Sequence, residues 1–276
     1  PSYAENGMPK ERYKLYHVER AKGGVGLTMT AGSAVVSPDS PSTFGNLHAY
    51  KDEIIPWLKK ITQECHDYGS KVMIQITHLG RRTNWNHSDW LPVLSASQVR
   101  EPAHRAFPKE AEDWDIDRII NDYANAAQRM KEANMDGIEI EAYGHFLDSF
   151  WSPATNKRKD EYGGILENRL KFSLKVIEAI RKSVGKKFII GVRMVADEDW
   201  NKGLSKEDGL KIAHKIINTN KVDFLNIIRG HIDTDSALSK VIPIQGMPSS
   251  PHLEFTGDIK KQISFPVFHA SKINDV

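Results

Sequence analysis

The chain has 276 residues, 39% of them hydrophobic, and its 38 Lys and Arg against 36 Asp and Glu give a formal net charge of +2. This length allows one large core or two smaller ones, and the balanced charge excludes the basic surface of a nucleic-acid-binding protein. The single cysteine, Cys65, excludes an internal disulfide and a cysteine-ligated metal or iron–sulfur centre within these residues. No apolar run approaches the roughly 18 residues of a membrane span and no secretory leader is visible, so we expect a cytoplasmic protein.

Short apolar runs alternate with helical patterns along the whole chain. In chain order the patterns predict a helix at 9–21, a strand at 25–31, a helix at 54–69, a strand at 71–78, a helix after Asp115, a strand at 137–143, a helix at 166–185, a strand at 187–195, a helix after Ser205, a strand at 222–228, a helix at 257–263 and a strand at 265–270. Ser205 with Asp208 three residues later has the spacing of a capping box.

This alternation is typical of βα units around a parallel sheet, either a doubly wound sheet or a barrel. The glycine-rich stretch at residues 23–26 precedes the first strand, whereas a dinucleotide-binding fold needs it directly after that strand. Long loops follow the strands and tight joints precede them, which favours a barrel with its site in the βα loops.

We therefore expect an α/β fold, a (β/α)8 TIM barrel in which six strands are present and the first and eighth barrel strands are missing. The chain starts at Pro1 without a methionine and stops at Val276, just past an apolar strand. We interpret residues 1–276 as one barrel domain, a fragment of a longer chain.

Polar side chains interrupt three of the expected strands, although barrel strands covered on both faces should be apolar. They are Gln75, Glu139, Glu141 and Arg193. A buried arginine needs a partner, because uncompensated charge burial is costly. Arg193 therefore either forms a structural ion pair with Glu139 or Glu141, or faces a bound anionic or electron-rich group. Gln75 is either a satisfied core amide or a contact to the edge of a heterocycle.

Four segments resemble the old yellow enzyme superfamily of FMN-dependent oxidoreductases: QITHLGR (75–81), GIEIEAYGHFLDSFWSP (137–153), NKRKDEYGGILENRLKF (156–172) and GVRMVADE (191–198). The resemblance implies a (β/α)8 barrel with FMN at its C-terminal mouth. It implies that Gln75 hydrogen-bonds the pyrimidine edge of the flavin and that Arg193 lies near N1 and the C2 carbonyl. It also implies that Gly32 lies against the ring, and that Ala270 and Ser271 begin the phosphate site.

The segment after the strand at 137–143 departs from the ene-reductases of this family, which carry a His-x-x-His or His-x-x-Asn pair followed by a proton-donating tyrosine. Allowing a one-residue deletion, Glu141 and Tyr143 replace the pair and His145 replaces the tyrosine. An ionised carboxylate only accepts hydrogen bonds, so Glu141 suits an amine better than a carbonyl. The segment resembles the amine-oxidising branch with trimethylamine, dimethylamine and histamine dehydrogenases, above all the N-demethylases of dimethylglycine or N-methylproline.

This resemblance implies hydride transfer from the carbon next to nitrogen of an N-methylated amine or amino acid to flavin N5. Glu141 would bind the cationic substrate and stabilise the iminium, while Tyr143 and His145 would orient it or accept its proton. Each of the three has a structural alternative, as a partner of an arginine, a packing residue and a loop histidine. Three tryptophans could form a cation–π wall: Trp85, Trp90 and Trp151.

Two rival functions stay open. One is an ene-reductase that uses NAD(P)H on enones or dienoyl thioesters, with Glu141 an incidental replacement. The other is a barrel isomerase or aldolase that binds a phosphorylated substrate, against which the lack of a strand-end catalytic lysine counts. Full-length members of the amine branch continue into an iron–sulfur site and a second nucleotide domain, so we expect these cofactors and a homo-oligomer only in a longer protein. For this chain we expect a small-molecule amine, no metal, no nucleic acid and no membrane.

Overall fold

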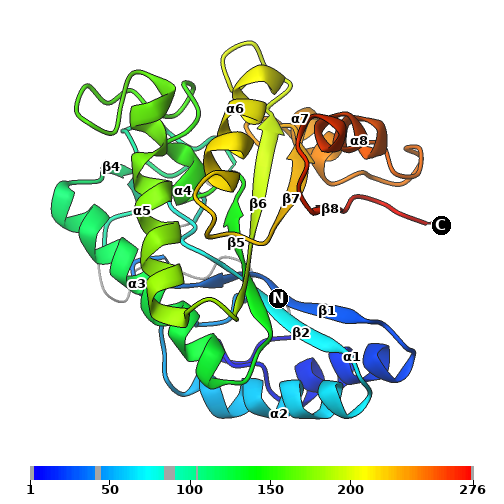
Figure 1. Cartoon of the computed structure of the whole chain (residues 1–276). Coiled ribbons are helices and arrows are strands. Elements are labelled where there is room, and N and C mark those ends of the chain that lie inside the picture. The colour runs from blue at the N-terminus through cyan, green and yellow to red at the C-terminus, as the bar shows by residue number, and fades with distance from the viewer. Residues whose placement is uncertain (1–2, 41–44, 84–90, 104, 275–276) are drawn as a thin grey trace.

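The computed structural model describes residues 3–40, 45–83, 91–103 and 105–274. Its elements in chain order, drawn in Figure 1, are α1 (Glu11–Lys22), β1 (Leu27–Val35), α2 (Ile54–Asp67), β2 (Lys71–Thr77), β3 (Leu94–Ser95), β4 (Lys109–Glu110), α3 (Asp113–Glu132), β5 (Gly137–Ala142), α4 (Phe146–Ser149), α5 (Leu166–Val184), β6 (Ile189–Asp197), α6 (Lys206–Ile217), β7 (Phe224–Arg229), α7 (Asp235–Val241), α8 (Leu253–Gln262) and β8 (Val267–His269).

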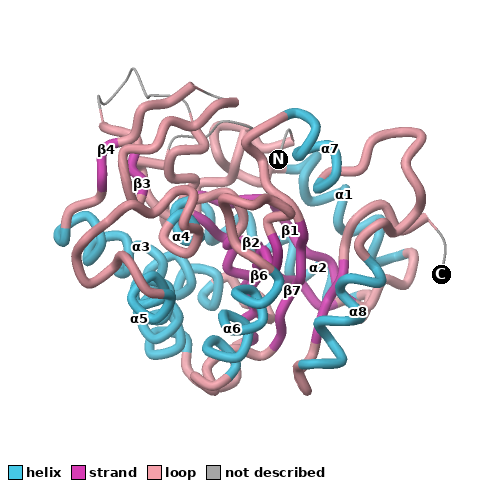
Figure 2. The backbone as a smooth tube through the Cα atoms, turned by 90° about the horizontal axis from the view of Figure 1, so that it is seen from above, coloured by secondary structure: helices cyan, strands magenta, loops and turns pink. Residues whose placement is uncertain are grey.

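Six parallel strands form one curved sheet in the order β1-β2-β5-β6-β7-β8. The order follows the chain without reversal, and the long helices lie along the outer side of the strands (Figures 1 and 2). A doubly wound sheet would reverse its order at a switch point and carry helices on both faces. The structure therefore excludes that alternative and has the form of part of a barrel wall. That the first and eighth barrel strands are missing stays a prediction.

Side-chain alternation separates an apolar outer face of the sheet from a polar inner face. Ile74, Ile138 and Ile190 lie in register on neighbouring strands and are fully buried in the core under the helices. Because successive side chains of a strand point to opposite faces, the adjacent Gln75 and Glu139 point to the concave side. The hydrophobic effect thus fixes the strand register, and the register fixes where the polar groups lie.

Local signals place the helix ends close to their predicted positions. The capping box of α6 is confirmed, since the hydroxyl of Ser205 accepts a hydrogen bond from the backbone N–H of Asp208 at 3.2 Å. The helix α5 ends at Gly185, whose φ of +78° favours a residue without Cβ. The helix predicted from residue 9 begins at Glu11.

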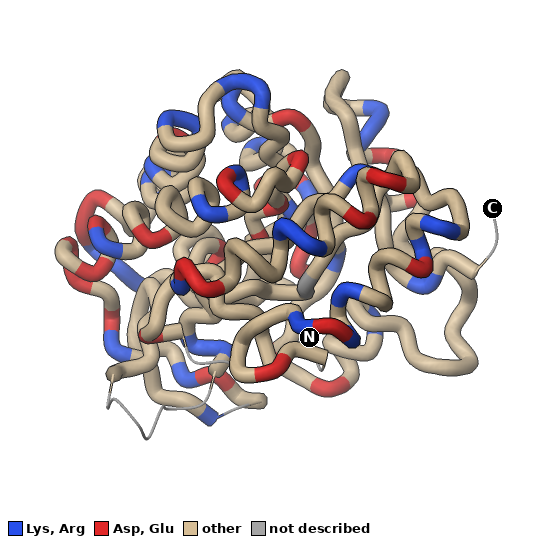
Figure 3. Tube along the Cα trace, turned by 90° about the horizontal axis from the view of Figure 1, so that it is seen from below, with Lys and Arg blue, Asp and Glu red and all other residues tan. Residues whose placement is uncertain are grey.

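All six predicted strands of the main sheet are present, but several short elements were not predicted. They are the two-stranded sheet of β3 and β4 and the helices α4 and α7. Elements of two to seven residues are too short to show a periodic pattern. Acidic and basic residues are intermingled over the helices (Figure 3). No helix in the described part of the chain is long and apolar enough to cross a bilayer.

The close packing of α6 on β6 can be tested at Gly209. A Cβ atom there would come within 1.9 Å of the carbonyl oxygen of Ala196. Alanine favours a helix over glycine by about 1 kcal/mol, yet we expect Gly209→Ala to lower the free energy of unfolding by about 2 kcal/mol, because α6 must move away from the strand.

Gly257→Ala in α8 is the matched control, since apart from its chain neighbours and the nearby backbone of α8 no described atom lies within 4 Å of its added Cβ. We expect it to raise the free energy of unfolding by about 0.5–1 kcal/mol. Urea unfolding of both variants measures the two effects. A Gly209→Ala protein as stable as the parent would show that the contact is not tight.

Candidate active site

The polar side chains that interrupt the strands meet on the concave face of the sheet. Strand register places Gln75 beside Glu139, and Arg193 between Glu141 on one neighbouring strand and Asn226 on the other. Since all strands are parallel, their carboxyl ends lie at one edge, where barrel enzymes carry their active sites. Residues far apart in sequence are thus brought to a single place in the fold.

Glu139 links two of these residues through its carboxylate, while Asn226 Oδ1 stays without a partner among the described residues. Its Oε1 accepts from Gln75 Nε2 at 2.7 Å and its Oε2 accepts from Asn226 Nδ2 at 2.8 Å. Burial raises the pKa of Glu139, while the two amides and Arg193 act in the opposite direction. Gln75 is therefore a bonded core amide, and it also lines the cavity described next. Asn226 was missed, although it interrupts an apolar strand as Gln75 does.

Arg193 forms no ion pair with any residue that the structure describes, because no carboxylate oxygen lies within 4.0 Å of its guanidinium. The structural ion pair considered from the sequence is therefore not formed. The side chain is half-buried and lines a cavity of about 660 Å³, together with Gly32, Gln75 and Ala270. A cation in this position can attract a negative or electron-rich ligand into the cavity.

The cavity fits FMN in size and chemistry. Its volume lies within the roughly 300–1,000 Å³ typical of cofactor sites. Arg193 can neutralise negative charge on a reduced ring, and Gly32 exposes backbone without a side chain. At the β8 end, His269 Nε2 and Ser271 Oγ are buried atoms without hydrogen-bond partners among the described residues. Ser271 has a φ of 120°, an unusual backbone for a residue with Cβ.

Glu141 lies at the carboxyl end of β5 with its carboxylate buried. Ser33 Oγ donates a hydrogen bond to Glu141 Oε2 at 2.5 Å. Burial raises the pKa of Glu141 to about 7, against the opposing effects of Ser33 and Arg193. The carboxyl group therefore changes its charge near neutral pH, which suits a group that exchanges a proton with a substrate. The Ser33 contact was missed from the sequence, where a hydroxyl in a strand gives no particular signal.

Two further side chains, His145 and Tyr143, lie near Glu141. Both are uncharged at neutral pH. His145 Nδ1 lies 2.9 Å from Thr77 Oγ1 and 3.5 Å from Glu141 Oε2. Burial lowers the pKa of His145 well below its usual value, so this is a contact of a neutral imidazole rather than an ion pair. Burial also raises the pKa of Tyr143, whose hydroxyl is buried without a partner among the described residues. The tyrosine thus offers a proton for a hydrogen bond.

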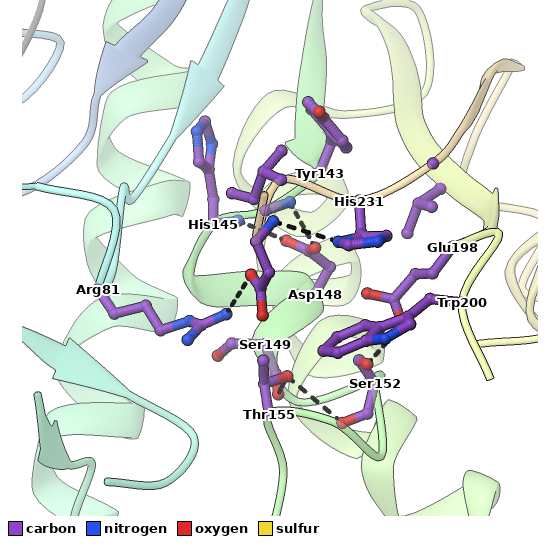
Figure 4. A pocket seen from close by; sticks show the side chains of 15 residues that line it. Arg81, Tyr143, His145, Asp148, Ser149, Ser152, Thr155, Glu198, Trp200 and His231 are labelled. Carbon is purple, nitrogen blue, oxygen red and sulfur yellow. Dashed lines mark hydrogen bonds and ion pairs between the residues drawn. The ribbon is translucent and has the colours of Figure 1, made fainter. Parts of the chain in front are cut away.

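Asp148 holds the loop that carries these two side chains. It accepts from the backbone N–H of Gly144 at 2.6 Å and from that of His145 at 2.8 Å. Burial raises the pKa of Asp148 to about 6. Figure 4 shows this loop at a cavity of about 20 Å³, with Glu198 on its other wall. The cavity has room for about one water molecule next to the reactive loop.

Other predicted residues have structural contacts. The cation–π role expected of Trp151 is wrong, because its ring is fully buried and its Nε1 donates to Ser173 Oγ at 2.5 Å. Trp85 and Trp90 lie outside the described residues. Arg82 and Asp148 were not predicted as site residues. A second basic residue directly after the QITHLGR segment was the available signal for Arg82.

The fold is that of part of a barrel, and Arg193, which has no ion-pair partner among the described residues, lines a cavity of the size of a cofactor site. The chain belongs to the NADH:flavin oxidoreductase / NADH oxidase family, whose model matches residues 2–276. The resemblance to old yellow enzymes is therefore confirmed, and membership implies an FMN cofactor.

Named relatives cover almost the whole chain. It is 59% identical over 276 residues to the "Probable N-methylproline demethylase" of Rhizobium meliloti (strain 1021), covering 100% of this chain and 41% of the relative. It is 42% identical over 270 residues to the "Multifunctional alkene reductase/demethylase OYE" of Caballeronia cordobensis, covering 98% of this chain and 40% of the relative. The chain thus spans about two-fifths of the length of these relatives.

The fold is also that of solved structures. A 2-naphthoyl-CoA reductase in complex with 2-naphthoyl-CoA superposes with a TM-score of 0.89 at 24% identity, covering 99% of this chain and 43% of that one. At this identity the likeness shows the fold alone, which places the curved sheet in the barrel class.

The raised pKa of Glu141 predicts a pH-dependent gain of stability in Glu141→Gln. Below pH 4.5 the carboxyl is neutral in the folded and unfolded chain, whereas above pH 7 folding buries its charge. We expect no gain at pH 4.5 and a gain of about 2–3 kcal/mol at pH 8.5, measured by urea unfolding. Glu132→Gln, on an exposed residue, is the control. A gain independent of pH would contradict the buried charge.

Proposed function

We propose that residues 1–276 are the FMN-binding barrel domain of an oxidoreductase that removes an N-methyl group from an amino acid or a related amine. One observation carries the choice of substrate. Glu141 is a buried carboxylate in the candidate site with no cation at ion-pair distance among the described residues, since His145 is neutral. A cationic amine is the ligand that such a group attracts most strongly. The name of the relative at 59% identity supports the same choice.

FMN supplies a hydride acceptor when it is bound. Gln75 and Arg193 would hold the ring, Gly32 would leave room for it, and Ala270 and Ser271 would face its phosphate. The positive charge of Arg193 favours the electron-rich, reduced form of a ring bound beside it. The chain itself then has to bind the amine, take its proton and exclude bulk water.

Glu141 is the residue best suited to take the proton. An amine loses a hydride only in its neutral form, because the nitrogen lone pair must enter the new C=N bond. Burial raises the pKa of Glu141 to about 7, so its carboxylate can accept the ammonium proton near neutral pH. The proton-accepting role expected for Tyr143 and His145 therefore moves to Glu141, since the imidazole is a weak base here and the phenol stays protonated.

The products follow from the balance of atoms. Loss of a hydride from the N-methyl carbon leaves an iminium cation, and the carboxylate of Glu141 can stabilise that positive charge once it has released the proton it accepted. Addition of water to the iminium carbon gives a carbinolamine, which breaks to formaldehyde and the demethylated amine with release of a proton. Oxidation at a carbon other than methyl would yield a different aldehyde or ketone by the same balance.

The ene-reductase is the rival that the relatives leave in place, because one of them is named both alkene reductase and demethylase. Its reaction needs a hydrogen-bond donor to a substrate carbonyl; an ionised Glu141 cannot donate, so the Tyr143 hydroxyl would have to take that role. The isomerase or aldolase alternative fails, because the chain belongs to a flavin oxidoreductase family.

Flavin reduction separates the two redox reactions. We expect anaerobic N-methylproline to bleach the flavin absorbance of the full-length, FMN-loaded protein in stopped flow and to release formaldehyde. We expect NADH and NADPH to reduce it slowly at best. Rapid bleaching by a nicotinamide, followed by reoxidation with an enone and no reaction with the amine, would establish the ene-reductase instead.

The role of Glu141 in turnover has its own test. We expect Glu141→Gln to lower kcat/KM for N-methylproline by about 10²-fold or more, because it removes the proton acceptor and the charge that faces the ammonium group. The rising limb of the pH profile near pH 7 should disappear with it. Glu132→Gln serves again as the control, and unchanged turnover in Glu141→Gln would remove Glu141 from the mechanism.

A further inference from the structure

Two consecutive arginines after β2 differ in their partners. Arg81 donates to the carbonyl oxygens of Val99 at 3.3 Å and Arg100 at 3.0 Å, and it pairs with Asp233 at 3.3 Å. Arg82 is 9% exposed, and its Nη1 is a buried atom without a hydrogen-bond partner. In the described part of the chain its guanidinium also has no ion-pair partner. The contacts of Arg81 thus give it a structural role, whereas no contact in the described part of the chain compensates the buried charge of Arg82.

Arg82 lies next to the candidate active site without lining either of the two cavities described above. A Cβ built on Gly144 would lie 3.2 Å from Arg82 Nη1, so the guanidinium lies against the loop between Tyr143 and His145. Burial raises the pKa of Tyr143, and Arg82 is the charge that opposes this rise most. The hydroxyl of Tyr143 is the second buried polar atom here without a partner among the described residues. Two buried donors without partners among the described residues therefore lie near the same loop.

The Arg82 guanidinium and the Tyr143 hydroxyl both need a hydrogen-bond acceptor, and the guanidinium also needs a negative charge nearby. A buried guanidinium without a counter-charge is costly, and a neutral carbonyl would satisfy its hydrogen bonds but not its charge. A carboxylate does both, because it accepts from a guanidinium and a hydroxyl at the same time. Glu141, which faces the same loop, provides the opposite charge for an ammonium group. Together the site offers both counter-charges of a zwitterion.

We propose that Arg82 binds the carboxylate of the substrate, with the Tyr143 hydroxyl as second donor, so that the enzyme selects N-methyl amino acids over simple amines. The inference rests on the proposed function and adds the residue that sets its substrate class. A simple amine leaves Arg82 unpaired and repelled by the ammonium group, so the same residue discriminates against it. Arg82 acts on binding and orientation, while the proton chemistry stays with Glu141.

The test compares N-methylproline with N-methylpyrrolidine, which has the same ring and N-methyl group but no carboxylate. We expect Arg82→Gln in the FMN-loaded, full-length protein to lower the ratio of kcat/KM for these two substrates by about 30-fold or more. Arg82→Lys, which keeps the charge but not the fork of donors, should fall in between. Arg100→Gln, on an exposed arginine of the next loop, is the control and should keep the ratio.

Calorimetric titration with the same two compounds gives a readout that does not depend on turnover. We expect Arg82→Gln to weaken binding of N-methylproline much more than binding of N-methylpyrrolidine. An equal loss for both compounds in a folded Arg82→Gln protein, or no loss, would overturn the proposal. If the parent protein oxidises neither compound, the demethylase function fails, and the titration still decides whether Arg82 holds a carboxylate.

Discussion

A buried charge must find a counter-charge, and the candidate site of this protein consists of charges that the described chain does not pair. Arg193 and Arg82 have no ion-pair partner among the described residues, and Glu141 has none there either, since its near contacts are the Ser33 hydroxyl and a neutral histidine. Such groups cost folding free energy unless a ligand compensates them. The same fold pairs Arg81 and Arg118 with nearby carboxylates. We therefore propose that these charges mark where ligands bind.

The site separates a fixed part from a reactive part. Gln75, Glu139 and Asn226 are bonded to one another on neighbouring strands and form a rigid floor under the cavity. Tyr143 and Arg82 keep polar atoms without partners among the described residues, and Glu141 changes its charge near neutral pH, as the proposed substrate contacts require. When a rigid scaffold holds polar groups that lack hydrogen-bond partners, a substrate that binds to those groups is held in one orientation.

Burial sets the protonation states that the proposed chemistry needs. It moves the pKa of Glu141 up to about 7, keeps His145 neutral and keeps Tyr143 protonated. All three shifts have desolvation as their first cause, and they come from one apolar environment around the loop after β5. Asp148 holds that loop through two backbone N–H groups. The position of the loop and the acidity of its side chains are thus consequences of the same packing.

The sequence by itself determined the βα alternation, the parallel barrel-type sheet, its six strands and the polar positions within them, because periodic apolar patterns and strand interruptions are local properties. Four sequence motifs also indicated the flavin oxidoreductase family. Only the tertiary structure decided that Arg193 lacks an ion-pair partner among the described residues, that Trp151 is a core residue and that Arg81 and Arg82 differ in their partners. Those outcomes depend on which strands and loops lie side by side, and a contact between residues distant in the chain leaves no signal in either segment alone.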